Sequence, residues 1–68
     1  MKKNTLLLAE SIKELFESKN YAAIRAAINA TEPQDLAIVC EELDGEMLIR
    51  FFRLMPKTVA AETFTEME

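Results

Sequence analysis

The chain has no histidine and no tryptophan, and it has one cysteine among 68 residues. Nucleophilic catalysis by Ser, Thr or Cys needs a neighbouring base, most often His, so the usual hydrolase arrangements are excluded. A single cysteine cannot form an internal disulfide, and without histidine it cannot complete an ordinary zinc site. We therefore expect a protein that is not an enzyme, and a cytoplasmic location fits this composition best.

Long apolar segments are also missing, because no stretch without a charged residue is longer than six residues. A membrane-spanning helix needs about 20 apolar residues, so we expect no direct insertion of this segment into a bilayer. The N-terminus resembles the start of a signal peptide, but only residues 6–9 are apolar before Glu10. A signal peptide needs an apolar region of about 7–15 residues, so this interpretation fails on length.

Glycine occurs once and proline twice, which leaves few turn residues for hairpins, and no segment alternates apolar with polar residues. Apolar residues instead recur five times at the helical spacing of i, i+3, i+4 and i+7. Asn4, Asn20 and Asp44 are suitable N-caps, and Pro33 and Pro56 suit the first turn of a helix. The predicted helices are residues 5–18, 21–30, 33–43, 45–55 and 57–67.

A chain of this length forms one domain at most, residues 1–68, and buries only about 60% of its surface on folding. The connections of one to three residues make successive helices neighbours in space. The predicted core consists of the inward positions of the helices: Leu8, Ile12, Leu15, Ile24, Ile28, Leu36, Val39, Cys40, Leu43, Phe51 and Phe52.

The pattern Pro-x-x-aliphatic-Ala occurs at residues 33–37 and again at residues 56–60. A repeated helical unit favours a stack of short helices, a small superhelix, over a closed bundle. The last apolar stripe, with Val59, Phe64 and Met67, lies at the end of the chain. We expect the natural domain to continue, and the isolated chain to self-associate, exchange its last helix or be mobile there.

Charge divides the chain, with a net charge of +2 for residues 1–30 and −6 for residues 31–68. The acidic half and the lack of interleaved basic and aromatic residues exclude a nucleic-acid partner. An acidic half suits a basic partner or a divalent cation, or it is only a solubilising surface. The acidic run at residues 41–46 lacks EF-hand spacing and is interpreted as a helix end followed by the Asp44 N-cap.

Three further positions have competing interpretations. Cys40 lies within an apolar stripe and is interpreted as core packing. Arg50 and Arg53 flank two phenylalanines and are either solvated neighbours of a buried aromatic pair or part of an anion site. Glu62 follows two alanines, so its surroundings can be approached closely, although a carboxylate on a helix surface is usually only solvated.

Four segments occur in a characteristic order: PQDLA at 33–37, EELDGE at 41–46, FFRLMPK at 51–57 and AAE at 60–62. This ordered set resembles the cytosolic N-terminal domain of MgtE-type magnesium transporters. That family repeats a pattern like Pro-x-Asp-Leu-Ala, Glu-Glu-Leu, an acidic start, Leu-Phe-Arg-Leu-Leu-Pro-Lys and Ala-Ala-Glu. The resemblance extends over about residues 5–68 without gaps.

The resemblance implies a right-handed superhelix of short helices, of which this chain holds about the first half. In the family this domain precedes CBS modules and a five-helix membrane domain, and the transporter works as a homodimer at the inner membrane. Magnesium ions between the N domain and the CBS modules hold the closed state. Glu62 matches a family carboxylate near such ions and is the candidate metal ligand. The other ligands lie beyond Glu68, so we expect Mg²⁺ binding by the isolated chain to be weak or absent.

The alternative hypothesis is a free-standing helical-repeat module that binds partner proteins. The coding sequence after residue 68 discriminates between the two hypotheses. Continuation into more helices, CBS modules and five apolar spans favours the transporter, and a stop codon favours the free-standing module.

Overall fold

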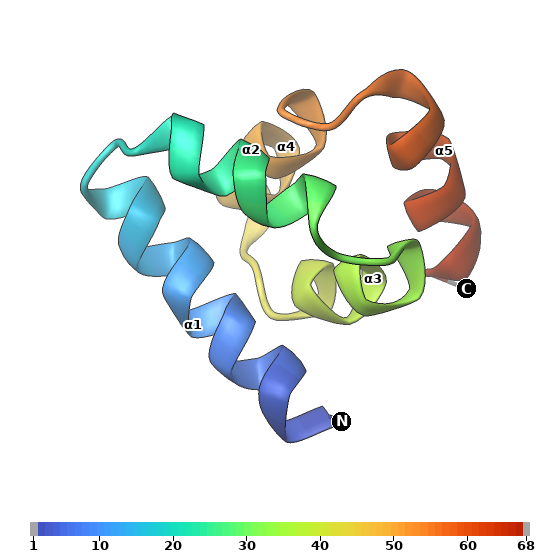
Figure 1. The fold of residues 1–68 in the computed structure, drawn as a ribbon, viewed down its shortest axis with the longest axis horizontal. Helices are drawn as coiled ribbons and strands as arrows, with labels where there is room; N and C mark the ends of the chain where they lie inside the picture. Colours follow the sequence, from blue (N-terminus) through green and yellow to red (C-terminus); the bar gives the residue numbers. More distant parts are fainter. Residues whose placement is uncertain (1, 68) are drawn as a thin grey trace.

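The computed structural model describes residues 2–67, and these residues contain helices and turns but no strand (Figure 1). The predicted all-α fold and the number and order of its helices are therefore confirmed for this part of the chain. In the described residues, no helix is both long and apolar enough to cross a membrane. The five helices are α1 (Lys2–Glu17), α2 (Tyr21–Asn29), α3 (Pro33–Glu41), α4 (Gly45–Arg53) and α5 (Lys57–Glu66).

The junction between α1 and α2 shows why the chain turns where it does. The N–H of Lys19 donates to the carbonyl of Phe16, and the N–H of Asn20 donates to the carbonyl of Leu15. This pair of bonds is a Schellman motif, in which the residue after the helix is left-handed, and Lys19 has a φ of 60°. The side chain of Asn20 then accepts a hydrogen bond from the N–H of Ala23 at 3.3 Å. The prediction of Asn20 as the N-cap of α2 is therefore confirmed.

The other predicted helix starts have mixed outcomes. Pro33 lies in the first turn of α3, as predicted, while Pro56 occupies the N-cap position of α5, just before the helix. Asp44 occupies the N-cap position of α4, but its side chain makes no capping hydrogen bond. The prediction of Asn4 as an N-cap is wrong, because α1 begins at Lys2 and Asn4 lies inside the helix.

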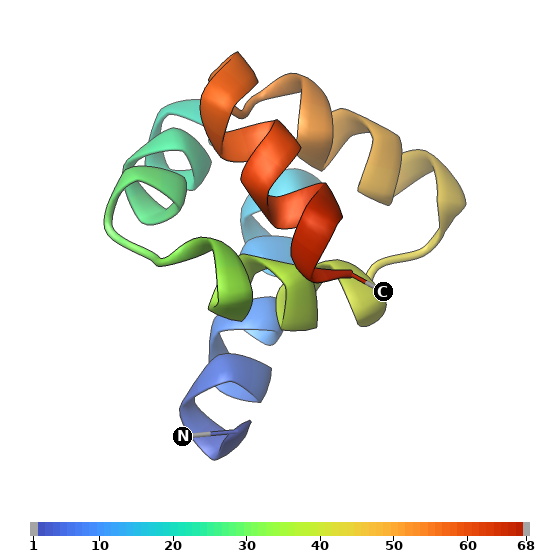
Figure 2. The ribbon, with the colours of Figure 1, turned by 90° about the vertical axis from the view of Figure 1, so that its right-hand side faces the viewer.

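The helices pack in a layered arrangement around α3. The most extensive helix–helix packing joins α3 to α5, followed by α1 to α3 and α1 to α2. Figure 2 shows α5 crossing in front of α3, with α1 on the opposite side. Whether this arrangement is one part of a longer superhelix stays a prediction.

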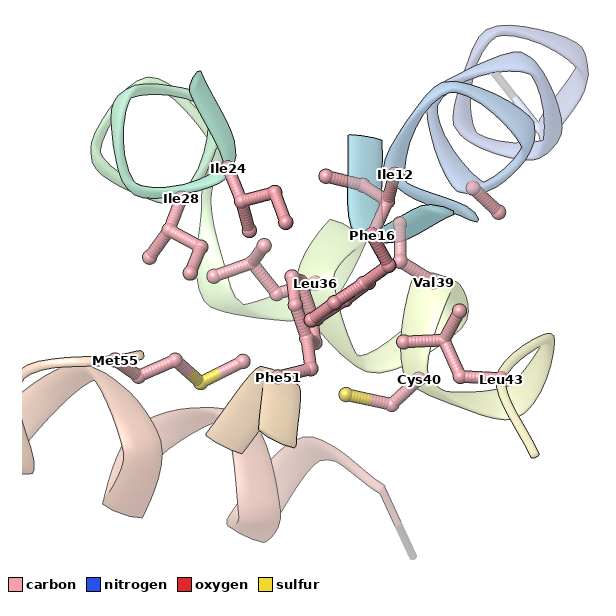
Figure 3. Packing of buried hydrophobic residues seen from close by; sticks show 11 residues of the cluster. Ile12, Phe16, Ile24, Ile28, Leu36, Val39, Cys40, Leu43, Phe51 and Met55 are labelled. Carbon is pink, nitrogen blue, oxygen red and sulfur yellow. The ribbon is translucent and has the colours of Figure 1, made fainter. Parts of the chain in front are cut away.

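The hydrophobic core lies where all five helices meet, around the ring of Phe51 (Figure 3). Phe51 is fully buried, and its ring meets Phe16 edge-on with centroids 6.4 Å apart. Phe16 also contacts Tyr21 edge-on at 6.2 Å. Edge-on geometry is a favourable arrangement for aromatic pairs because it brings a positive ring edge to a negative ring face. The aromatic contacts thus tie α4 to α1 and α1 to α2.

Eight of the eleven predicted core residues are buried: Ile12, Ile24, Ile28, Leu36, Val39, Cys40, Leu43 and Phe51. Leu8, Leu15 and Phe52 are only half-buried and pack against the edge of the core. Their prediction as interior residues is corrected, because each lies at the border of its apolar stripe, while Ala9, Phe16 and Met55 fill the interior positions.

Candidate functional site

Glu62, the predicted metal ligand, lies on the exposed side of α5. Glu62 and Ala61 are exposed, whereas the next residue, Thr63, is fully buried against the core side of the helix. No ion pair or hydrogen bond involves the Glu62 carboxylate within the described residues. Among residues 2–67, no group of three or more His, Cys, Asp or Glu side chains could hold a metal ion. This region of the chain therefore offers Mg²⁺ one carboxylate from Glu62.

The acidic run at residues 41–46 joins the end of α3 to the start of α4. Its carboxylates do not converge on a common point that could hold a metal ion within the described part of the chain. Glu46 instead turns along its own helix, and its Oε2 accepts a hydrogen bond from Nη2 of Arg50 at 3.3 Å. Both side chains are largely exposed, so this pair contributes only a few tenths of a kcal/mol, about 0.3–0.5.

Cys40 is buried among the core residues, with 1% of its surface exposed. Burial in apolar surroundings, with a smaller contribution from the nearby Glu41 charge, raises the pKa of the Cys40 thiol to about 11. The reactive form of cysteine is the thiolate, so at neutral pH this thiol is protonated and inaccessible. The structure agrees with the interpretation of Cys40 as a packing residue.

The two candidate arginines of α4, Arg50 and Arg53, are joined by a third from α2, Arg25. All three line one open hollow of about 250 Å³ between α1, α2 and α4, which we call the arginine hollow. They are the only arginines in the sequence, and none of the five lysines lines this hollow. Its remaining lining residues are apolar or aromatic: Phe16, Tyr21 and Leu54.

Charge in the arginine hollow is only partly compensated. In the described part of the chain, the one ion pair joins Arg50 to Glu46, so Arg25 and Arg53 have no carboxylate partner. This occurs in a chain with twelve acidic residues and a net charge of −4. The sequence pointed to Arg50 and Arg53 beside two phenylalanines. In the structure these two arginines belong to a larger basic site that also includes Arg25.

An apolar groove of about 460 Å³ separates α4 from α5, which we call the α4–α5 groove. Its walls carry two of the most exposed large apolar side chains, Ile49 at 55% and Phe64 at 70%. Figure 2 shows the two helices joined at the top and diverging below that turn. The residues that line the groove are Leu48, Ile49, Phe52, Arg53, Ala60, Phe64 and Met67.

Sequence reasoning found part of these two sites. It placed Phe64 and Met67 on an open apolar face, and Phe64 is indeed exposed, while Met67 and Val59 are half-buried against the core. It did not connect Arg25 with Arg50 and Arg53, because these residues lie 25 and 28 positions away from Arg25 and come to line one hollow only in the fold. The available signal was that the chain has only three arginines and that each lies on a helix.

No protein-family model, no curated protein and no solved structure matches the chain. The relation to MgtE-type transporters therefore stays a resemblance of sequence segments. The function proposed below is supported by those segments together with the positions of the residues described above.

Proposed function

We propose that the chain is a non-catalytic cytosolic module of an MgtE-like magnesium transporter that takes part in magnesium-dependent closing. The ordered segments that carry the resemblance support this function. Pro33 begins α3 and Pro56 immediately precedes α5, so both copies of the repeated pattern start a helix. In this proposal the partners are the CBS modules and membrane domain of the same transporter, which works as a homodimer.

The observation that carries the proposal is the free carboxylate of Glu62 on the exposed side of α5. Magnesium keeps several water ligands and is usually held by one or two protein carboxylates. A carboxylate with no partner on its own surface suits an ion that is shared with a second surface. Mg²⁺ would then reduce the repulsion between two acidic faces and hold them together, which is a local electrostatic event with a large conformational readout.

The first test is the coding sequence that follows the codon for Glu68, which must encode further helices, CBS modules and five apolar spans. The second test is limited proteolysis of that full-length transporter over a Mg²⁺ titration. Glu62→Gln should move the protection midpoint to higher Mg²⁺ concentration without unfolding the domain, because the exposed carboxylate contributes little to stability. Glu66→Gln is the matched control, since it removes the same charge from an exposed position on the same helix. An unchanged midpoint for Glu62→Gln would reject the metal-bridging role.

The α4–α5 groove favours a second candidate function, that of a protein-interaction module, and we propose a second copy of this chain as its occupant. The exposed ring of Phe64 stands beside an apolar hollow on the same face. A protrusion next to a hollow is self-complementary under a two-fold axis, because each copy can insert its protrusion into the other.

The charges along the α4–α5 groove support the same occupant. Arg53 and Lys57 lie where the two helices are joined, and both are exposed. Glu46 lies in the first turn of α4 and Glu66 ends α5, so the opposite ends of these helices are acidic. A two-fold axis perpendicular to the groove runs the two copies antiparallel and places the basic end of one copy at the acidic end of the other.

Sedimentation equilibrium up to about 1 mM chain tests this assembly. We expect a weak dimer, because seven residues line the groove, fewer than the about 20–30 residues on each side of a standard interface. Phe64→Asp should make the chain monomeric, whereas Leu7→Asp, at a comparably exposed apolar residue of α1, should leave the dimer intact. A monomeric wild-type chain would contradict the proposal. A dimer that persists in Phe64→Asp would also contradict it and would point to exchange of α5 between copies.

A further inference from the structure

The arginine hollow combines three features that a ligand-binding surface needs. It is concave, three arginines from two different helices line it, and its other lining side chains are apolar or aromatic. Arg25 comes from α2, while Arg50 and Arg53 come from α4. The site is separate from Glu62, which lies on α5 and does not line the hollow.

The choice of arginine over lysine indicates the chemistry of the ligand. A guanidinium presents its donors as a planar fork that matches the paired oxygens of a phosphate or carboxylate, whereas a lysine is a point charge. Three positive charges near one another repel, and only Arg50 has a carboxylate partner among the described residues. A bound anion would remove that repulsion and satisfy the free donors of Arg25 and Arg53.

The aromatic residues restrict the ligand further. Phe16 and Tyr21 line the hollow and are held in an edge-on pair at 6.2 Å. Phe16 is also fixed from the other side by its contact with the buried ring of Phe51. Phe16 is itself only 8% exposed, so the half-buried Tyr21 supplies most of the aromatic contact area that this part of the hollow offers to a hydrophobic body. A small hydrophilic anion would use the arginines and leave this area exposed.

We infer that the arginine hollow binds an anionic group carried on an aromatic body, with an aryl phosphate as the best match. The phosphate contacts the guanidinium groups of Arg25 and Arg53, and the aromatic ring lies against Phe16 and Tyr21. A free aryl phosphate and a phosphorylated tyrosine in a peptide share this chemistry. The inference is independent of the transporter proposal, because it involves none of the residues that the latter requires.

The test is a titration of the purified chain with phenyl phosphate, followed in ¹H–¹⁵N NMR spectra that include the arginine Nε–H signals. The backbone N–H of Tyr21 and the Nε–H of Arg25 belong to residues that line the hollow, so their shifts report directly on it. We expect saturation within about 10 mM, with shifts at Tyr21 and Arg25. Inorganic phosphate should bind more weakly, and phenol should not saturate. A phosphotyrosine peptide that binds more tightly than phenyl phosphate identifies a peptide as the source of the group.

Variants separate a built site from general attraction to positive charge. Arg25→Gln and Arg53→Gln should each raise the dissociation constant about tenfold, since each removes a charged donor. Lys57→Gln is the control, because it removes the same charge from an exposed residue outside the hollow, and it should leave the constant within about twofold. Thermal unfolding of each variant verifies the fold. Equal weakening by Lys57→Gln, or no saturation by the wild-type chain, would overturn the inference.

Discussion

Two phenylalanines of the same chain have opposite surroundings. Phe51 of α4 is fully buried at the centre of the core, whereas Phe64 of α5 is 70% exposed beside the α4–α5 groove. Both lie on short helices with apolar residues at helical spacing. The difference teaches that an apolar stripe is buried only where another helix stands opposite it. Helices surround the core, whereas no helix of the described residues covers the open side of the α4–α5 groove.

The packing of α5 explains this asymmetry. Its strongest packing is with α3, and the residue that it buries completely is Thr63 rather than Phe64. One position along a helix corresponds to about 100° of rotation, so burial of Thr63 turns the ring of Phe64 away from the core. α4 likewise directs Phe51 inward and leaves Ile49 on the groove. The exposed apolar surface is therefore a consequence of how two helices are rotated.

The largest expected effect comes from removing the buried ring of Phe51. Phe51→Ala should lower the free energy of unfolding by about 3–5 kcal/mol, because it removes a buried ring and leaves a cavity. A chain of this size has a total stability of only about 3–10 kcal/mol, so the variant is expected to lose a large share of its stability. Urea denaturation followed by circular dichroism measures both variant and wild type.

Phe64→Ala is the matched control for that substitution. The same ring is removed from an exposed position, and we expect a change of about 0.5 kcal/mol or less in dilute solution. Similar losses for Phe51→Ala and Phe64→Ala would show that α5 is rotated differently from the structure described here.

A second prediction concerns the buried side of α5, which packs against α3. Within residues 2–67, the buried hydroxyl oxygen of Thr63 has no hydrogen-bond partner, and an unsatisfied buried hydroxyl costs about 1–3 kcal/mol. Thr63→Val keeps the shape and removes the polar atom, so we expect a gain of about 1–2 kcal/mol in unfolding free energy. Thr65→Val, at an exposed residue of the same helix, should change stability by about 0.5 kcal/mol or less. A destabilised Thr63→Val would show that the hydroxyl is satisfied in solution.

The comparison also shows which parts of the fold are predictable from sequence. The number, order and type of the helices follow from periodicity and from local signals such as Asn20 and Pro33, because these depend on residues close in the chain. The residues at the border of a stripe, such as Phe52, are less predictable. Their burial depends on the rotation of one helix against another, which is set by the sum of all contacts.

The candidate sites differ in the same way. The exposure of Phe64 could be anticipated from its place in the last stripe, whereas the presence of Arg25 and Arg53 in one hollow could not. The first is a local property of one helix, and the second needs the relative position of α2 and α4. Thr63 lies four residues after Val59, about one helical turn along the chain, yet nothing in the sequence indicates that its hydroxyl lacks a partner.

The smallest expected effect compares the helix starts of the two regions. Asn20 caps α2 through a hydrogen bond to the N–H of Ala23, and Asn20→Ala should cost about 1 kcal/mol. Asp44 precedes α4 without such a bond. Its charge favours the positive end of the helix dipole, but it is also repelled by Glu42 and Glu46, so Asp44→Ala should cost less than Asn20→Ala. Urea denaturation at low and at 0.5 M salt separates the two contributions, since salt screens the charge of Asp44 and leaves the neutral Asn20 bond unchanged. A loss for Asp44→Ala as large as that for Asn20→Ala, independent of salt, would mean that Asp44 caps α4 by a hydrogen bond in solution.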